Sequence, residues 1–380
     1  MLNLSTRSKG YSRSLENRIC YVTEADLDRH GVGGVVTDQQ MLSRLKELAN
    51  VDVIYLRRLT YRSTPLALLV FFFQILSSFS KRYAIYFSRG LIASSLLVSF
   101  NMMMSKKRRI IKRALSVPFA SEEVEFLKYG RVESFLRYSL FLFLQQYVYP
   151  RVDFVTVAAE SYKRQMIEAG VRDEKIHVVS FNVGEEYFSQ PLKSQADRIF
   201  NFCYVGGFHR YQDLLPVLAA FEIVSKSKRD VRLILVGDGP QHPELQEEAT
   251  KRGLRKRVEF VGVVPHASLP LLLHQIDCFI SVTRKPGLSI SILEAAATGK
   301  AIITFVPKNE LNYGGCFRHK KEIYLVNSVS PDEIAQAMEL LHENSSLRNR
   351  IAQGAREVAQ KHFSEKVTRK QLEKLLLKIS

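Results

Sequence analysis

The 380-residue sequence predicts an α/β protein with two doubly wound, Rossmann-like domains that face a central cleft. The chain is longer than one ordinary domain of about 100–150 residues, and its 46% apolar content suffices for two cores. Apolar runs alternate with helical patterns twice, before and after the polar stretch 185–198. We therefore place an N-terminal domain at 1–190, a second domain at 191–364 and a C-terminal amphipathic helix at 365–380.

The first half opens with a strand–loop–helix–strand unit. The apolar run 18–24 predicts a strand, the glycine-containing loop 31–34 a turn, and the helical spacing of apolar residues in 37–49 a helix. Residues 51–56 predict the next strand, which indicates a parallel sheet with right-handed crossovers. The later predicted elements are strands at 82–89, 152–159 and 175–181 and helices at 120–149 and 160–170.

The second half repeats this alternation. The predicted strands lie at 199–207, 231–239, 258–264, 277–283, 300–306 and 322–327. The predicted helices lie at 213–226, 243–253, 267–275 and within 284–305. Ser330 to Glu333 form a capping-box pattern with Pro331 at the first helical position, which predicts a helix over 331–343.

Positive charge is concentrated in one interval. The net charge is +17, and no acidic residue lies between Asp52 and Glu122. The basic residues of this interval are Arg57, Arg58, Arg62, Lys81, Arg82, Arg89, Lys106, Lys107, Arg108, Arg109, Lys112 and Arg113. The interval also holds the apolar segments 66–76 and 91–104, and the first is well short of the ~20 residues that span a bilayer.

Apolar segments flanked by Lys and Arg are attracted to anionic membrane surfaces, so we expect such a surface as a partner. The alternative is that both segments are core helices and the charges form a solvated face. No nucleic-acid-binding motif accompanies the charge, so we expect no nucleic acid as a partner.

The four cysteines, Cys20, Cys203, Cys278 and Cys316, show no CxxC pair or zinc spacing. Three lie in or beside apolar segments, which favours buried free thiols over a metal site and fits a reducing compartment. The first residues lack a hydrophobic signal core, so we do not expect export. These features predict a cytoplasmic protein, peripheral on the membrane face.

Three glycine-containing loops after predicted strands are candidates for holding an anion. They are Gly31 to Gly34, 205–212 with Gly206, Gly207, His209 and Arg210, and 283–289 with Arg284 and Lys285. In doubly wound sheets ligands bind beyond the carboxyl ends of strands, and helix N-termini there suit phosphate. Each loop alone also fits an ordinary turn, but three at corresponding strand ends favour a shared anionic ligand.

Glu294 lies in the otherwise apolar part of RKPGLSISILEAAATGKAIITF, residues 284–305. If the helix begins near Ser289, Glu294 lies one to two turns inside, on the side of the anion-binding loop. A buried carboxylate requires hydrogen-bond donors, and the vicinal hydroxyls of a ribose would supply two. The alternative is a partly exposed glutamate paired with a lysine.

The second half resembles the group-one retaining glycosyltransferases, whose fold is called GT-B. The resemblance covers residues from about 201 to 364 and includes VRLILVGDGPQHPELQEEATKRG, GLSISILEAAATGKAIIT and PDEIAQAMELLHEN. The first half matches more loosely, through GVGG and residues 161–188. The resemblance implies a nucleotide-sugar donor held mainly by the second domain, a glycan or lipid-linked acceptor held mainly by the first, and no metal or other cofactor.

The resemblance also implies donor-binding roles. Glu294 would bond the ribose, backbone amides at 287–289 would meet the sugar or diphosphate, and residues 260–262 would lie against the base. The expected donor-binding residues are Gly33, Gly34, Gly206, Gly207, Arg210, Gln212, Phe260, Val261, Gly262, Arg284, Lys285, Gly287, Leu288, Ser289 and Glu294.

Two positions depart from the family pattern. The family usually has a second glutamate eight positions before Glu294, where this chain has Pro286. It also has an arginine and a lysine in the loop after the first strand of this domain, where ungapped alignment places Gly207 and Gln212. We expect Arg210, Arg284 or Lys285 to replace these counter-charges of the diphosphate.

Arg89, at the end of a first-domain strand, is the candidate catalytic residue, and the alternative places it in the basic surface. We expect a glycosyltransferase of polysaccharide biosynthesis that moves a sugar from a nucleotide sugar to a glycan or lipid-linked glycan. The alternative is a degenerate relative that binds nucleotide sugar or glycan as a scaffold protein, because Pro286 removes an expected contact.

Overall fold

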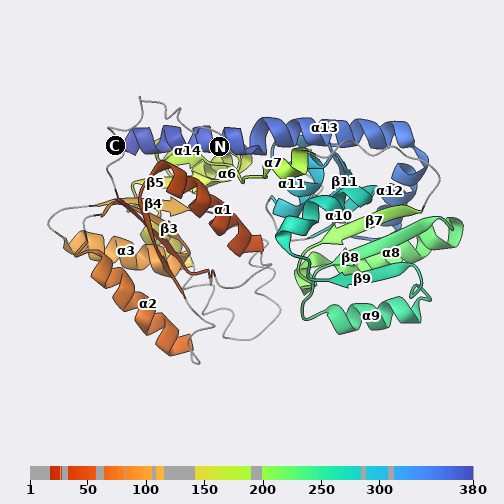
Figure 1. Cartoon of the computed structure of the whole chain (residues 1–380), viewed down its shortest axis with the longest axis horizontal. Coiled ribbons are helices and arrows are strands. Elements are labelled where there is room, and N and C mark those ends of the chain that lie inside the picture. Colours follow the sequence, from red (N-terminus) through yellow and green to blue (C-terminus); the bar gives the residue numbers. More distant parts are fainter. Residues whose placement is uncertain are drawn as a thin grey trace, which may run out of the picture.

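The computed structural model contains two α/β domains that lie side by side (Figure 1). Each domain is built on a six-stranded sheet, where the sequence predicts five strands in the first domain and six in the second. The structure describes residues 18–25, 27, 33–56, 64–81, 83–104, 108–114, 142–189, 199–283, 288–306 and 312–379.

The first sheet has the strand order β2-β1-β3-β4-β5-β6, and all neighbouring strands are parallel. The strands are β1 (Arg18–Thr23), β2 (Val51–Tyr55), β3 (Tyr83–Arg89), β4 (Arg109–Arg113), β5 (Phe154–Val157) and β6 (Ile176–Val178). The strand order reverses direction between β1 and β3. The carboxyl ends of these two strands therefore flank the topological switch point, where ligands bind in doubly wound sheets.

β4 has no counterpart among the predicted elements, because flanking basic residues mask its short apolar core, Ile110 and Ile111. Lys112 and Arg113 on this strand are only 4% and 5% exposed. The prediction of a solvated or membrane-facing charge is therefore wrong for these two residues. The position of β4 inside the sheet places them in the domain interior.

The helices of the first domain include the two apolar segments. They are α1 (Gly33–Leu48), α2 (Thr64–Ser78), α3 (Leu91–Met103) and α6 (Glu160–Glu168), with the 3-10 helix η1 (Asp173–Lys175) before β6. α1 begins before the predicted residue 37, so Gly33 and Gly34 belong to its first turn. Residues 142–148 are helical, while the predicted helix from 120 to 141 lies outside the described residues.

The second sheet has the order β14-β11-β10-β7-β8-β9, again with parallel neighbours. Its strands confirm all six predicted in this half: β7 (Phe200–Val205), β8 (Val231–Val236), β9 (Val258–Gly262), β10 (Cys278–Ser281), β11 (Ala301–Phe305) and β14 (Tyr324–Val326). A short antiparallel pair, β12 (Asn312–Tyr313) and β13 (Phe317–Arg318), was not expected. The switch point of this sheet lies between β7 and β10.

The second domain carries its helices between these strands and after the last one. They are α8 (Leu214–Ser227), α9 (His242–Lys251), α10 (Leu269–Gln275), α11 (Ile290–Ala297), α12 (Pro331–Glu343) and α13 (Ser345–Phe363), with the 3-10 helices η2 (Arg210–Gln212) and η3 (His266–Ser268). α12 has the predicted bounds. The Ser330 hydroxyl accepts from the Glu333 N–H at 3.3 Å, but the Glu333 carboxylate accepts from Asn327, so half of the capping box forms.

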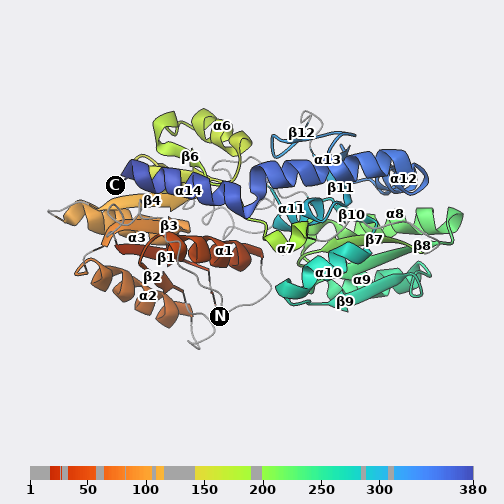
Figure 2. The same ribbon diagram turned by 45° about the horizontal axis from the view of Figure 1, so that its top comes forward.

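Two chain segments cross between the domains next to each other. The Val183 N–H donates to the Phe363 carbonyl at 2.9 Å, and Val183 pairs with Ser364 in a parallel bridge. The first crossing leads into α7 (Glu185–Phe188), so the predicted linker 185–198 is helical at its start. Residues 190–198 of this linker lie outside the described part of the chain. The second leads into α14 (Glu365–Ile379), which returns along the first domain (Figures 1 and 2).

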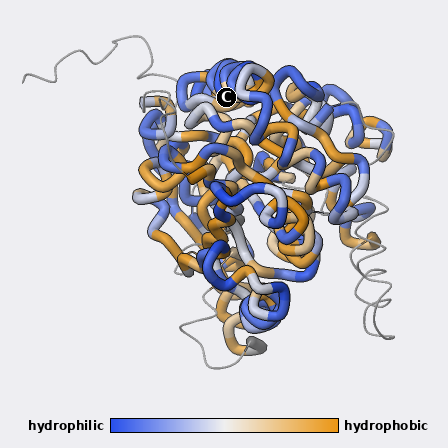
Figure 3. The backbone as a smooth tube through the Cα atoms, turned by 90° about the vertical axis from the view of Figure 1, so that its right-hand side faces the viewer, coloured by the Kyte–Doolittle hydropathy of each residue, from blue (hydrophilic) through white to orange (hydrophobic). Residues whose placement is uncertain are grey.

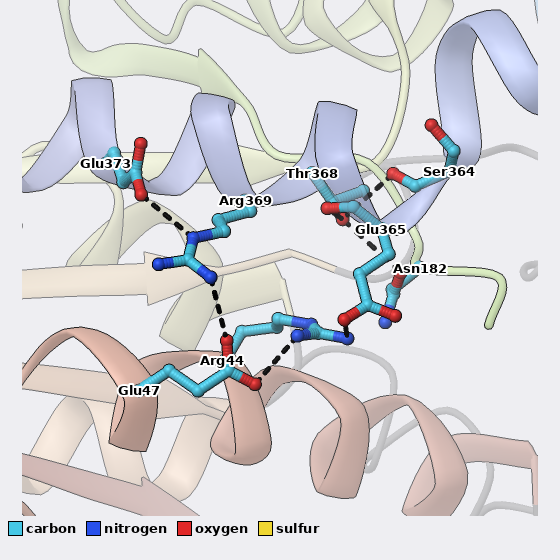
Figure 4. Close-up of polar contacts among 8 residues, drawn as sticks. All are labelled: Arg44, Glu47, Asn182, Ser364, Glu365, Thr368, Arg369 and Glu373. Carbon is cyan, nitrogen blue, oxygen red and sulfur yellow. Dashed lines mark hydrogen bonds and ion pairs between the residues drawn. The ribbon is translucent and has the colours of Figure 1, made fainter. Parts of the chain in front are cut away.

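α14 completes the core of the first domain. Leu372, Leu375 and Leu376 pack in one hydrophobic cluster with residues of β1, α1 and β3, which confirms the predicted amphipathic helix. Figure 4 shows the polar edge of this contact: Arg369 lies 3.4 Å from Glu47 on α1 and 3.0 Å from Glu373. Arg44 on α1 pairs with Glu365 as well.

The hydropathy colouring in Figure 3 shows hydrophobic segments concentrated toward the middle of the molecule. All four cysteines are free thiols; Cys20, Cys203 and Cys278 are buried, as predicted, and Cys316 is half-buried. Burial raises the pKa of the Cys20 and Cys316 thiols to about 12, so both remain protonated at neutral pH.

We predict that Leu375→Ala lowers the free energy of unfolding by about 2–5 kcal/mol, because it leaves a cavity between α14 and the first domain. Leu375 is 1% exposed, whereas its neighbour Leu377 is 50% exposed. Leu377→Ala is therefore the matched control. Urea denaturation followed by circular dichroism measures both variants, and equal stability of the two would contradict the packing of α14.

Candidate functional site

The switch point of the second sheet brings together the loops that follow β7 and β10. α11 begins after the second loop, with Ser289 as its N-cap residue, and Glu294 lies in its second turn. Glu294 is 2% exposed. This burial excludes the alternative of a partly exposed glutamate paired with a lysine.

Two hydrogen-bond donors from distant segments reach the Glu294 carboxylate. His266 of η3 lies with its Nε2 2.7 Å from Glu294 Oε1. The Tyr187 hydroxyl of α7 lies 3.1 Å from the same nitrogen and also hydrogen-bonds Glu294. A protonated Nε2 cannot accept a hydrogen bond, so the consistent arrangement has Nε2–H and the Tyr187 O–H both donating to Glu294.

These contacts change the pKa of both donors. The hydrogen bond to Glu294 is the main cause of the raised pKa of His266; burial acts in the opposite direction, and the charges of Glu294 and Glu186 add to the increase. Burial and then the charge of Glu294 raise the pKa of Tyr187. The Tyr187 hydroxyl therefore keeps its proton, and remains a donor, across the physiological range.

His266 and Tyr187 are absent from the predicted site. His266 follows β9, and Tyr187 lies in the predicted linker, so only the tertiary structure relates them to Glu294. A sequence clue existed, because a buried carboxylate requires donors and His266 occupies another strand-end loop of the same domain.

The amides at the start of α11 donate to two tyrosine hydroxyls. The Leu288 N–H donates to Tyr162 of α6, and the Ser289 N–H donates to Tyr313 of β12 at 2.7 Å. Both tyrosines are less than 8% exposed. Tyr162 belongs to the first domain, so the two domains meet at the amides that the sequence assigns to donor binding. In this structure protein oxygens satisfy these amides.

The loop after β7 carries Gly206, Gly207, Arg210 and Gln212. An added Cβ on Gly237 would lie 1.9 Å from the Gly206 carbonyl oxygen. The loops after β7 and β8 are therefore so close together that position 237 requires glycine. Arg210 is exposed at the start of η2, and Gln212 is half-buried at its end. The switch point therefore has an exposed cation on its β7 side.

Phe260, Val261 and Gly262 end β9 at the edge of the sheet. The Phe260 ring stacks on His242 with 5.4 Å between centroids, and Val261 is 38% exposed. Gly262 has φ of 78°, which favours glycine. Their contact with a base stays a prediction. Arg284, Lys285, Pro286 and Gly287 lie outside the described residues.

The switch point of the first sheet holds a buried ionic network. Asp38 of α1 accepts hydrogen bonds from Arg89 at 2.5 Å and from Arg113 at 3.0 Å. Tyr21 and Thr23 donate to the same carboxylate. The Arg89 side chain is 20% exposed. This pairing excludes the alternative that Arg89 belongs to a basic surface, while its catalytic role stays a prediction.

Lys112 lies beside this network. Its Nζ donates to the Gly90 carbonyl at 2.8 Å, and burial lowers the pKa of Lys112 to about 8. Glu24 accepts the Ala93 N–H at 2.8 Å in the first turn of α3. The carboxyl edge of the first sheet therefore gathers charged groups around Asp38 of α1, the helix that begins with Gly33 and Gly34.

Two features are absent from the described ranges of the chain. No group of three or more His, Cys, Asp or Glu side chains there is arranged to hold a metal ion. In the same part of the chain, no helix combines the length and apolar character needed to cross a membrane.

Residues 185–358 match the family model described as "Glycosyl transferases group 1". This segment belongs to the group 1 glycosyl transferases. It contains α11, Glu294, His266 and Tyr187, so the buried carboxylate and both of its donors lie within the segment that matches the family.

Curated relatives agree with this family. An uncharacterized glycosyltransferase of Methanocaldococcus jannaschii is 23% identical over 73% of this chain and 70% of its own length. An Arabidopsis thaliana component of phosphatidylinositol N-acetylglucosaminyltransferase is 26% identical over 38% of this chain and 32% of its own length. Alpha-D-kanosaminyltransferase of Streptomyces kanamyceticus is 27% identical over 40% and 39%. The chain thus spans only about a third of the latter two relatives.

Solved structures show that the fold is GT-B. Sucrose-phosphate synthase from Thermosynechococcus elongatus has a TM-score of 0.78 at 16% identity, covering 96% of this chain and 99% of that one. HepE of Anabaena, solved with UDP and glucose, has a TM-score of 0.73 at 16% identity, covering 94% and 99%. The likeness extends over both domains and confirms the predicted fold class.

We predict that the pairing of His266 with Glu294 stabilises the protein more at low than at high pH. The pKa of His266 in the folded state lies above its ordinary value of 6.5. The stabilisation is therefore complete below that ordinary value and is lost as pH rises through the folded-state pKa.

The measurement is the free energy of unfolding of the native protein minus that of His266→Gln, from about pH 6 to about pH 9. Other histidines titrate in both proteins, so their effects cancel. We expect the difference to fall with rising pH, and a constant difference would contradict the raised pKa.

Proposed function

We propose that this glycosyltransferase moves a sugar, with retention and without a bound metal, from a nucleotide donor to a glycan or lipid-linked acceptor. Membership of the group 1 family indicates sugar transfer from a nucleotide sugar. The observation that carries the donor assignment is the burial of Glu294 at the switch point, in the second turn of the helix that follows β10.

Glu294 would bind the vicinal hydroxyls of the donor ribose. A carboxylate offers about four acceptor positions, and its protein donors, His266 and Tyr187, use only some of them. The N-terminal amides of α11 would then lie toward the diphosphate, where a helix terminus favours negative charge. Tyr162 and Tyr313 must release these amides when the donor binds.

Positive groups would stabilise the leaving diphosphate as the bond between the sugar and its phosphate breaks. Arg210 is exposed on the β7 side of the switch point, and Arg284 and Lys285 precede α11 in the sequence. Arg89 remains the first-domain candidate for the reacting centre. Its pairing with buried Asp38 fixes its guanidinium at the carboxyl end of β3.

Two features support a lipid-linked acceptor at an anionic membrane surface. Two relatives are named for lipids, one for phosphatidylinositol and one, an alpha-monoglucosyldiacylglycerol synthase of Streptococcus pneumoniae, for diacylglycerol. The adjacent helices α2 and α3 have no charged residue and lie together on the outside of the first domain (Figures 1 and 2).

Several apolar side chains of these helices are exposed, while others, such as Phe71 and Leu97, are buried in the core. Phe73 and Leu69 of α2 are 55% and 52% exposed, and Met102 of α3 is 57% exposed. Lys81, just after α2, is exposed too. Apolar groups next to basic ones are the features that bind a protein to anionic headgroups. A cytoplasmic membrane face is the location that we propose.

We predict slow hydrolysis or transfer with one nucleotide sugar in a panel of uridine and guanosine donors, detected as release of nucleoside diphosphate. Glu294→Ala should lower kcat/KM roughly 100-fold or more, because charged hydrogen bonds to the ribose are lost. Glu247→Ala on α9 is the control, since its side chain is 67% exposed and pairs with Lys251.

Binding of a nucleotide sugar without turnover in any acceptor assay would instead support the scaffold function. We consider this function because Pro286 replaces the glutamate that usually contacts the donor sugar. Absence of binding to every donor in the panel would overturn both functions.

We predict that the protein sediments with vesicles of phosphatidylglycerol and phosphatidylcholine, and that salt weakens this binding. Phe73→Glu should weaken it roughly tenfold, because an apolar contact is replaced by a charge of the same sign as the lipid. Leu271→Glu on α10, 60% exposed in the second domain, is the matched control. Equal binding by both variants would exclude α2 as the contact surface.

A further inference from the structure

The donors of Glu294 come from two different parts of the chain. His266 lies in η3, directly after β9 of the second domain. Tyr187 lies in α7, four residues after Val183, where the chain crosses between the domains and pairs with Ser364. Glu294 and Tyr187 are almost completely buried, whereas the His266 side chain is 34% exposed.

Such an arrangement fixes the orientation of the carboxylate. A glutamate side chain has three rotatable bonds, and an isolated carboxylate in an apolar helix face would both lack donors and adopt several rotamers. Hydrogen bonds to a charged group are short and strong compared with neutral ones. Two of them, from fixed segments, hold Glu294 in one orientation and leave acceptor positions open.

We propose that His266 and Tyr187 are positioning residues for donor binding. They orient the Glu294 carboxylate toward the two vicinal hydroxyls of the donor ribose. This inference rests on the proposed function, because it takes the ligand of Glu294 to be a ribose. Neither residue needs to touch the nucleotide. Both act through Glu294.

The placement of Tyr187 has a further consequence. α7 follows the crossing at Val183, which is hydrogen-bonded to Phe363 at the end of α13. A change in the angle between the domains that shifts α7 would also shift the Tyr187 hydroxyl relative to Glu294. Ribose binding is therefore coupled to the arrangement of the two domains.

The test compares ligands that differ only at the ribose. Binding of UDP, GDP and their 2′,3′-dideoxy analogues is measured by calorimetry on the full-length protein. The native protein should bind the preferred ribonucleotide roughly 10- to 100-fold more tightly than its dideoxy analogue, the value of one charged hydrogen bond or more. Glu294→Ala should abolish this preference.

His266→Ala should weaken binding of the ribonucleotide roughly tenfold and leave binding of the dideoxy analogue unchanged. His266→Gln, which keeps an N–H donor, should restore most of the preference. Tyr187→Phe should reduce the preference in the same direction while retaining the ring. His362→Ala on α13 is the control for loss of an imidazole elsewhere and should change neither affinity.

The outcomes separate the inference from the proposed function. Equal losses for both ligands in His266→Ala and Tyr187→Phe would mean that these residues only stabilise the fold, and would overturn the inference. The inference would also be overturned if Glu294→Ala abolishes the preference for the ribonucleotide while His266→Ala and Tyr187→Phe both retain it. A native protein that binds no nucleotide, or shows no preference that depends on Glu294, would overturn the proposed donor site itself. If His266→Ala does not fold, His266→Gln and Tyr187→Phe provide the same comparison.

Discussion

A carboxylate buried in the second turn of an apolar helix requires hydrogen-bond donors, and this fold supplies them from two segments that lie far apart in the sequence. His266 comes from the loop after β9 and Tyr187 from the crossing between the domains. Their meeting at Glu294 requires that β9, β10 and α7 hold fixed relative positions. The candidate site is therefore a property of the assembled sheet and the crossing together, because no single segment could satisfy this carboxylate.

The same dependence on distant segments holds for the rest of the molecule. α14 belongs by sequence to the end of the chain, yet its leucines complete the core of the first domain. The ion pairs Arg44–Glu365 and Arg369–Glu47 tie it to α1. The two crossings pair at Val183 and Ser364. At the front of α11, Tyr162 of the first domain contacts the Leu288 amide of the second. Rearrangement of the domains thus affects the contacts of both the crossing and the candidate donor site.

The basic interval shows how tertiary structure sorts charges that look alike in the sequence. Lys112 and Arg113 turn inward from β4, and Arg89 pairs with Asp38 at the end of β3. Burial lowers the pKa of Lys112, because the protein interior disfavours the charged form. Lys81, by contrast, is exposed to solvent. Net charge alone therefore overstates the basic surface. The exposed apolar side chains of α2 and α3 support the proposed membrane attachment more strongly than the number of basic residues does.

The sequence by itself determined the alternation of strands and helices, the two sheets and the position of Glu294 near the start of a helix, because hydrophobic periodicity and capping residues act over a few neighbouring positions. It missed β4, whose two isoleucines lie between basic residues, and the pair β12 and β13, which is too short for a period. Only the tertiary structure decided that His266 and Tyr187 are the partners of Glu294, that Tyr162 and Tyr313 meet the amides of α11, and that Asp38 holds Arg89. These contacts join residues tens to more than a hundred positions apart, and their geometry depends on how whole sheets and helices pack, which local sequence patterns do not encode.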